Sequence, residues 1–371
     1  MKNHKNLLVK KKRIINLVGA RPQFIKAAMI SRVLGADYED LVEEIIVHSG
    51  QHYDFNLSGV FFEQLGIPKP DVFLEVNAEN SIAQFEAIKS SLNMKLMALK
   101  PHAIIVYGDT NTTRAGAEVA SALGIPIAHI EAGLRSHNFN MPEEHNRIVA
   151  DKLSSFLFTP NNAAIKNLQV EGIENSTTKI VENVGDVMLD SLRVFSPKAE
   201  LSKEIAKKLE DKKPMILVTI HRNYNADEPQ RLTNLIEALE DQNKKYQVVF
   251  PVHPRTAKGL KTENSPIIFL PPVSYFDMLA LEKRASLILT DSGGVQKEAY
   301  FFKKPLVILR SETEWTELVD NGLAVLSKLD AASVSEAIEK FKNFVYPEIP
   351  ALYGDGFAAQ KICKSLMAKL A

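Results

Sequence analysis

The sequence has almost no cysteine, since Cys363 is the only one among 371 residues. One thiol forms neither an intrachain disulfide nor a cysteine-based zinc cluster, and this composition fits a reducing, cytoplasmic location. The chain also lacks net charge, because 45 basic residues balance 45 acidic ones. Without an excess of basic charge, nothing favours a nucleic acid or a membrane surface as partner.

Long apolar runs are missing as well. The first apolar run, Ile14–Val18, follows the basic residues 10–13 and is too short for a signal peptide or a membrane span. No group of His, Cys and Asp has the spacing of a metal site, and no G-x-G-x-x-G pattern follows the first apolar run. We therefore expect no membrane segment, no metal and no dinucleotide cofactor.

What is present is a regular alternation of short apolar runs and helical patterns. Such alternation predicts an α/β fold with parallel sheets and helices on both faces. The length favours about two domains, whose carboxyl strand edges we expect to flank a cleft. Expected strands are Ile14–Val18, Ile45–Val47, the runs from Ile104 and Ile125, Phe156–Phe158, Ile180–Val184, Met215–Thr219, Gln247–Pro251, Ile267–Leu270, Ser286–Thr290 and Leu306–Leu309. Expected helices include 82–99, 161–171, 230–241, 275–283, 295–301 and 357–370, with a helix near 60–65 and a linking segment at 201–211.

Two carboxylates follow neighbouring runs of the first half. Asp109 comes just after the run from Ile104, and Glu131 just after the run from Ile125. Ligands of open α/β sheets bind at the carboxyl edge of the strands, so these groups are candidates for acid–base chemistry. The alternative is that both residues are helix caps or turn formers.

Two turns are suited to anions. Gly19–Pro22 joins a strand to a helix and carries the cation Arg21. The stretch Thr290–Glu298 is the stronger candidate, because Gly293 and Gly294 allow close approach of a phosphate to a helix N-terminus. Ser292 adds a hydroxyl donor, and Glu298 lies one turn into the helix, where it can accept bonds from ribose hydroxyls. The alternative is a tight turn in which glycine serves only the backbone.

Two histidines end strands of the second half. His221 precedes Arg222, and we interpret it as a group that acts on a leaving phosphate or as an acid. His253 ends the next strand, where positioning or ligand contact is expected. A histidine at a strand end is also commonly structural.

Taken together, these motifs resemble the non-hydrolysing UDP-N-acetylglucosamine 2-epimerase family. The motifs occur in the family's order: residues 19–22, 108–110, 129–135, 142–147, 221–222, 251–253, 291–294 and 353–356. The resemblance implies a GT-B fold of two Rossmann-like domains, residues 1–185 with the last helix, 356–371, packed back on them, and a UDP-binding domain of residues 186–355. It also implies a homodimer without metal or nicotinamide cofactor.

The resemblance implies roles for particular residues. Asp109, Glu131 and Glu143 match the family's acid–base carboxylates, and His221 its essential histidine. Nucleotide-sugar contacts are implied for Arg21, Lys26, Arg147, Ser292, Gly293 and Glu298, beside the Gly294 and His253 expected from the motifs. The implied reaction inverts C2 of a UDP-linked 2-acetamido sugar by eliminating UDP to a 2-acetamidoglycal and adding it back, for surface polysaccharide precursors.

The sequence departs from the commoner family form at Gln23, where that form has an acidic residue, and at Trp315, where it has arginine. At both positions the sequence is similar to the family branch that acts on UDP-2,3-diacetamido-2,3-dideoxy-glucuronate. The substrate is therefore open between UDP-N-acetylglucosamine and that uronate. A hydrolysing epimerase, a GT-B glycosyltransferase and a non-catalytic UDP-sugar sensor are the alternative functions.

Overall fold

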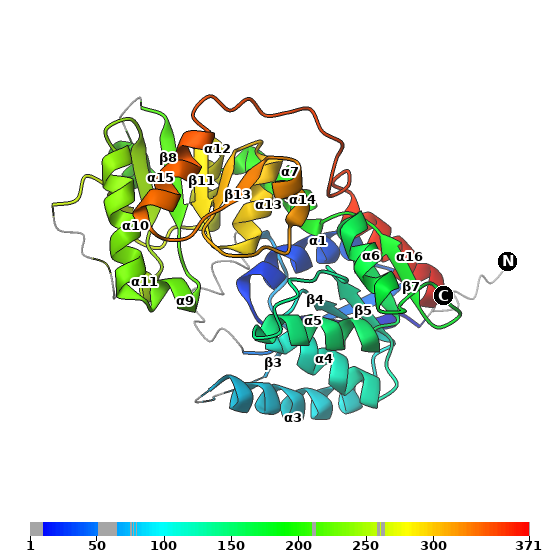
Figure 1. The fold of residues 1–371 in the computed structure, drawn as a ribbon. Coiled ribbons are helices and arrows are strands. Elements are labelled where there is room, and N and C mark those ends of the chain that lie inside the picture. The colour runs from blue at the N-terminus through cyan, green and yellow to red at the C-terminus, as the bar shows by residue number, and fades with distance from the viewer. Residues whose placement is uncertain are drawn as a thin grey trace, which may run out of the picture. The chain divides into compact units, whose positions relative to one another are not determined.

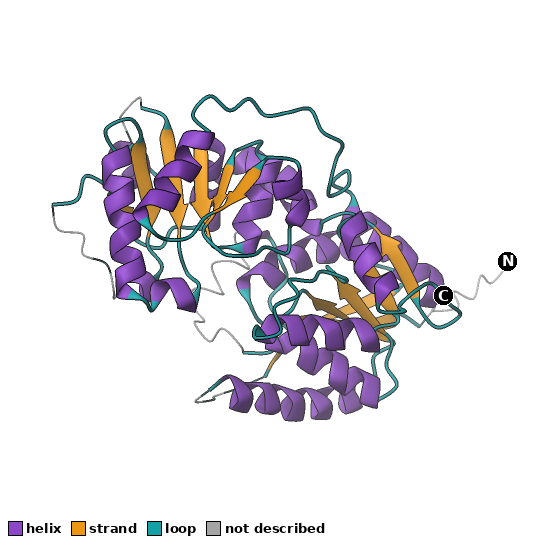
Figure 2. Ribbon diagram, in the orientation of Figure 1, coloured by secondary structure: helices purple, strands orange, loops and turns teal. Residues whose placement is uncertain are grey.

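The computed structural model describes residues 10–50, 65–74, 76, 78, 80–209, 213–257, 260 and 264–370. The helix expected near 60–65 lies almost entirely outside these residues. Strands and helices alternate along the described chain (Figure 2). The chain divides into two compact units: Met1–Ser191 with Tyr353–Ala371, and Leu192–Leu352.

The described part of the first unit contains a seven-stranded sheet in the order β3-β2-β1-β4-β5-β6-β7. Every neighbouring pair in it is parallel. The strands are β1 Lys12–Val18, β2 Val42–His48, β3 Val72–Phe73, β4 Ala103–Tyr107, β5 Ile127–Ile130, β6 Phe156–Thr159 and β7 Ile180–Asn183. β1 and β4 are nearly fully buried, which agrees with a sheet covered on both faces.

Helices cover both faces of this sheet. Residues of α3, α4 and α5 join one apolar core with β1, β2 and β4, and Figure 1 shows these helices stacked along that face. On the opposite face α1 packs against α16. The helices are α1 Arg21–Asp37, α3 Ser81–Leu99, α4 Asn111–Ala122, α5 Pro142–Leu153, α6 Asn162–Val170 and α16 Ala358–Leu370. The helix α7, Val187–Phe195, begins in this unit and ends in the second.

The C-terminal segment packs on the first unit through contacts of its backbone. The N–H of Asp186 donates to the Tyr353 carbonyl at 2.9 Å. Gly185 and Gly354 have positive φ and lie so close that a Cβ on Gly185 would be 2.8 Å from the Tyr353 oxygen. Asp190 accepts the N–H groups of Ala358 and Ala359 and so caps α16. The last helix thereby completes the core of the unit that contains the first strand.

The second unit repeats the plan. Its described residues form a six-stranded parallel sheet in the order β10-β9-β8-β11-β12-β13. One apolar core joins this sheet to α10 and α15. The strands are β8 Met215–Thr219, β9 Gln247–Pro251, β10 Ile268–Leu270, β11 Leu287–Thr290, β12 Leu306–Ile308 and β13 Ala324–Leu326. The helices are α8 Lys203–Lys208, α9 Asn223–Ala226, α10 Pro229–Gln242, α11 Pro254–Ala257, α12 Tyr275–Arg284, α13 Gly293–Phe301, α14 Thr316–Asp320 and α15 Ala331–Lys340.

The predicted fold class is confirmed: both units are Rossmann-like parallel sheets of the GT-B type. The expected strands are present with shifts of a few residues at their ends. The sequence interpretation did not include β3, β13, α5, α7, α14 or α15, nor the one-turn helices α9 and α11. Across the described residues, no helix is both long and apolar enough to cross a membrane.

Candidate active site

The candidate residues lie where the strand order of each sheet reverses. In the first unit this point is between β1 and β4, which are followed by Gly19 and by Gly108–Asp109. In the second unit it is between β8 and β11, which are followed by Ile220–His221 and by Asp291. Open α/β sheets bind ligands at such points. Each unit therefore brings its sequence motifs to the position where this fold places a site.

The main chain around Asp109 is held by side chains from three elements. Three consecutive carbonyls each accept a hydrogen bond from a side chain of α1, β5 or α5. These carbonyls and their donors are Tyr107 (Gln23 Nε2, 2.9 Å), Gly108 (His129 Nε2, 2.8 Å) and Asp109 (Asn146 Nδ2, 3.0 Å). The turn that presents the Asp109 carboxylate is thus fixed before any ligand arrives, which is the preorganisation that catalysis requires.

The His129 side chain is in turn oriented by the Asp151 carboxylate. Its Nδ1 lies 2.7 Å from Asp151 Oδ1, and both side chains are fully buried. Burial acts to raise the pKa of Asp151, but the charges and hydrogen bonds of His129 and Arg135 outweigh it and lower that pKa. The two ring nitrogens of His129 thus contact two different acceptors, the Asp151 carboxylate and the Gly108 carbonyl. The buried pair therefore fixes the orientation of the ring that contacts the Gly108 carbonyl.

The two predicted carboxylates that follow β4 and β5 each have a cationic partner. The Arg147 guanidinium contacts Asp109, and the Lys26 ammonium contacts Glu131. Both cations are buried, with 4% and 5% of their surface exposed, so the pairs are poorly screened by solvent. Glu131 also has a φ of +72°, a strained conformation for a residue with a side chain. The sheet edge thus presents two carboxylates, each of which is oriented by a buried cation.

The two glutamates at the start of α5 differ in their surroundings. Glu144 is buried and accepts the N–H groups of Ser136 and His137, and it pairs with Arg147 at 2.9 Å. Burial acts to raise the pKa of Glu144, but the Ser136 N–H and the Arg147 charge outweigh it and lower the pKa. Glu144 therefore holds the loop before α5, whereas the half-buried Glu143 stays the predicted acid–base group.

In the second unit, His221 is paired with a carboxylate that the sequence interpretation assigned only to a turn. His221 Nδ1 lies 3.0 Å from Asp291 Oδ1, and Asp291 is fully buried. Asp291 also accepts the main-chain N–H groups of His221 and Arg222 and the side-chain amide of Asn225. This pairing places the proton on Nδ1 and leaves Nε2 to exchange protons with a ligand. The His221 side chain is 42% exposed, which gives a ligand access.

Burial acts to raise the pKa of Asp291, but the hydrogen bond and charge of His221, with the bonds from Asn225 and Arg222, outweigh it and lower that pKa. Asp291 is thus a stable anion behind the imidazole. His253 follows β9, and the centre of its ring lies 6.4 Å from the centre of the His221 ring.

The glycine turn after β11 begins α13. Ser292 caps this helix by accepting the N–H of Val295. Gly293 and Gly294 form the first helical positions, and Glu298 lies inside the helix with 6% of its surface exposed. A Cβ on Gly293 would be 3.8 Å from Nε1 of Trp315. The Lys297 ammonium lies 4.4 Å from the centre of the Trp315 ring, so the departure at Trp315 borders the glycine turn.

The predicted residues are therefore divided between the units. The first contains Arg21, Lys26, Asp109, Glu131, Glu143 and Arg147, and the second contains His221, His253, Ser292, Gly293, Gly294 and Glu298. Arg21 begins α1, but its side chain lies outside the described part of the structure. The sequence interpretation missed the roles of Gln23, Asn146 and Asp291. Asp291 meets His221 because β8 and β11, which these residues follow, pair directly in the sheet, and the order of elements along the chain does not show that pairing.

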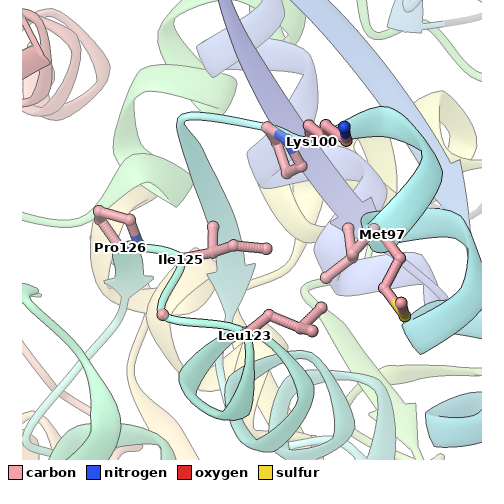
Figure 3. A pocket seen from close by; sticks show the side chains of 8 residues that line it. Met97, Lys100, Leu123, Ile125 and Pro126 are labelled. Atoms are coloured by element: carbon pink, nitrogen blue, oxygen red, sulfur yellow. The ribbon is translucent and has the colours of Figure 1, made fainter.

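A separate cavity of about 300 Å³ lies at the opposite edge of the first sheet. Figure 3 shows its lining, in which Lys100 lies among aliphatic side chains, at the turns that precede β4 and β5. The lining residues are Leu96, Met97, Lys100, Pro101, Leu123, Gly124, Ile125 and Pro126. Since none of the candidate acid–base residues lines it and it lies at the amino ends of the strands, it is not the candidate active site.

Comparison with known proteins agrees with the sequence resemblance. The model of the family described as UDP-N-acetylglucosamine 2-epimerase matches residues 36–367. The UDP-2,3-diacetamido-2,3-dideoxy-D-glucuronate 2-epimerase of Pseudomonas aeruginosa is 45% identical over 364 residues, covering 96% of this chain and 100% of that protein. The UDP-N-acetylglucosamine 2-epimerase of Methanocaldococcus jannaschii is 37% identical over 365 residues, covering 94% of this chain and 97% of that protein.

A solved structure of a Methanocaldococcus jannaschii UDP-GlcNAc 2-epimerase, in complex with UDP-GlcNAc and UDP, superposes with a TM-score of 0.87 at 35% identity. The superposition covers 96% of this chain and 99% of that one. Matches of this identity and coverage extend through both units, including the two edges that carry the candidate residues. The chain therefore belongs to the UDP-N-acetylglucosamine 2-epimerase family of isomerases.

Proposed function

We propose that this protein is a non-hydrolysing 2-epimerase of a UDP-linked 2-acetamido sugar. A base removes the proton at C2 while the C1–O bond breaks, and the bonding electrons leave with UDP. The product is a 2-acetamidoglycal. A proton is then delivered to the other face of C2 as a UDP oxygen forms the new C1–O bond, so no atom is gained or lost. The product would serve as a precursor of surface polysaccharide.

One observation carries this proposal: two carboxylates end the adjacent strands β4 and β5, and each is paired with a buried cation. C2 epimerisation needs one group to take a proton and another to give one, and two controlled carboxylates supply that pair. Asp109, Glu131 and Glu143 are the proposed acid–base groups. Lys26 would orient Glu131 and Arg147 would orient Asp109 until the sugar binds. With Arg21, both cations would contact the nucleotide sugar.

The second unit supplies what the departing diphosphate needs. The N–H groups at the start of α13 and the Ser292 hydroxyl can bind phosphate oxygens, and Glu298 can accept bonds from the ribose. His221, oriented by Asp291, can donate a proton or a hydrogen bond to the leaving UDP. We accordingly propose that Ser292, Gly293, Gly294, His253 and Glu298 contact UDP.

The 3-acetamido uronate is the second candidate substrate. It is supported by the 45% identity to the Pseudomonas aeruginosa enzyme named for that sugar. Trp315 beside Gly293, where the commoner family form has arginine, favours the same branch. Arginine and tryptophan differ in charge and in hydrogen-bonding capacity, so this position bears on how substituents of the sugar are recognised.

The test is deuterium exchange at C2, followed by NMR with each UDP-sugar in deuterated water. We expect deuterium at C2 and an epimer that stays linked to UDP. Accumulation of free UDP and free sugar would identify a hydrolysing epimerase. A C2 that keeps its hydrogen with both sugars would end the proposal and favour a glycosyltransferase or a UDP-sugar sensor.

We also propose that the protein works in the cytoplasm as a homodimer. The balance of charge and the single cysteine support a reducing compartment without a polyanionic partner. Light scattering coupled to size-exclusion chromatography measures the oligomeric state, and a monomeric mass at working concentration would contradict the dimer.

A further inference from the structure

Gln23 lies in the first turn of α1 and is not one of the proposed acid–base or nucleotide-binding residues. Only 2% of its surface is exposed. Its side-chain oxygen accepts the N–H groups of Gly19 at 2.8 Å and Ala20 at 3.1 Å. One end of the amide thus closes the turn that follows β1 and carries the start of α1.

The other end of the same amide reaches the turn that follows β4. Its Nε2 lies 2.9 Å from the Tyr107 carbonyl, 3.0 Å from Thr110 Oγ1 and 3.1 Å from Thr113 Oγ1. The orientation of the amide is unambiguous, because two N–H donors face its oxygen and a carbonyl faces its nitrogen. Gln23 therefore joins the two turns on either side of the point where the strand order reverses.

These contacts involve residues on both sides of Asp109 in the chain. Tyr107 precedes it by two residues, and Thr110 follows it and caps α4. Thr113 closes the arrangement by donating to the same Tyr107 carbonyl at 2.5 Å. Any shift of the amide would therefore move the turn that presents Asp109 relative to α1, which carries Lys26.

We propose that Gln23 is a positioning residue, which sets the place of the Asp109 carboxylate by donating a hydrogen bond from its amide to the Tyr107 carbonyl. This inference rests on the proposed 2-epimerase function. It assigns a role to a side chain at which the sequence departs from the commoner, acidic form of the family. What matters is the donor: a carboxylate of the same size can still accept from Gly19 and Ala20, but it has no proton for Tyr107.

The substitution Gln23→Glu isolates that donor. The ionised carboxyl would place an oxygen against the Tyr107 oxygen and push the two turns apart. A displacement well under 1 Å of a catalytic group lowers turnover by roughly tenfold or more. We expect that loss in kcat, measured as C2 deuterium exchange, with KM changed by less than about twofold because no proposed nucleotide contact is altered.

The pH dependence separates positioning from damage to the fold. Protonation of the introduced carboxyl restores a donor toward Tyr107, so the ratio of variant to wild-type kcat should rise as pH falls from about 9 to about 6. The matched control is Gln242→Glu, which introduces the same carboxyl at a buried glutamine of α10 in the second unit. It should lose stability without this pH-dependent loss of kcat.

A second measurement does not depend on activity. Hydrogen–deuterium exchange of the main chain at 108–113 should be faster in Gln23→Glu than in the wild type at the same alkaline pH, and unchanged in Gln242→Glu. If Gln23→Glu keeps the wild-type kcat at every pH, an acidic side chain fulfils the same role and the proposal is overturned. The proposal is also overturned if Gln23→Glu loses the same fraction of kcat at every pH, or if its hydrogen–deuterium exchange at 108–113 is unaltered. A wild type inactive on both sugars would instead refute the proposed function, and the exchange comparison would still decide the role of Gln23.

Discussion

The pairing of His221 with Asp291 leads to the sharpest prediction. The substitution Asp291→Asn keeps the size of the side chain but removes one acceptor oxygen and the negative charge. In the native protein Oδ1 accepts from His221 Nδ1 and its N–H, and Oδ2 accepts from the Arg222 N–H and Asn225 Nδ2. An asparagine can serve only one of these two pairs of donors.

The expected loss of stability follows from those contacts. Each buried donor left without an acceptor costs about 1–3 kcal/mol, so two of them lower the free energy of unfolding by about 2–6 kcal/mol. The imidazole also loses the partner that places its proton on Nδ1. Since a correctly protonated acid or base contributes about 10²- to 10⁴-fold to a rate, we expect kcat to fall by about that factor.

The assay compares kcat for C2 exchange with the urea midpoint of unfolding. Asp277→Asn is the matched control, because Asp277 is also a buried carboxylate of the second unit and accepts from the Ser202 N–H and the Ser274 hydroxyl. It should lower stability but leave kcat within about twofold. The reasoning is refuted if both variants lose kcat in proportion to their lost stability.

The same pair predicts a pH dependence of stability. Because the pKa of Asp291 is lowered in the folded protein, its contribution is present above the unfolded-state pKa and is lost as pH falls through the folded-state pKa. The difference in unfolding free energy between the wild type and Asp291→Asn should therefore shrink on acidification. A difference that stays constant from neutral to acidic pH would contradict the ionised carboxylate.

The remaining predictions concern the first unit. Lys26→Met should lower stability by about 3–5 kcal/mol, because it removes the buried cation of the ion pair with Glu131. Adding Glu131→Gln should restore stability but not turnover; denaturation and C2 exchange measure the two effects. Asp109→Asn should abolish turnover while UDP still binds by calorimetry, and retained turnover would remove Asp109 from the acid–base groups. Gly185→Ala should cost about 1–3 kcal/mol more than Gly172→Ala in thermal unfolding, because only at Gly185 would the new Cβ meet the Tyr353 backbone; equal costs would argue against that close approach.

The sequence allowed the sheets to be predicted because their strands are continuous apolar runs, as buried parallel strands require. The prediction of strands failed at the edges of the sheets. β13, Ala324–Leu326, is only three residues long and gives almost no pattern. α15 was missed although its signals are present, since Asp330 caps it and Val334, Ala337 and Ile338 share its buried face.

The polar contacts were harder to predict than the elements. The motifs identified Asp109 and His221 as candidates, but the partners Gln23, Asn146 and Asp291 depend on which strands adjoin. Gln23 and Tyr107 are far apart in the chain and meet only because β1 and β4 are neighbours. Sequence patterns give the order of elements along the chain, whereas such hydrogen bonds depend on the order of strands across the sheet.

The position of α16 has a consequence for synthesis of the protein. The second unit is one continuous segment, Leu192–Leu352, and can close its core while the chain is still on the ribosome. The first unit cannot, because Ile362, Cys363 and Leu366 of α16 fill its interior and are made only after the whole second unit. The half that is translated first is therefore the half that matures last, and a nascent chain stopped before α16 would expose an apolar face of α1 that attracts chaperones and proteases.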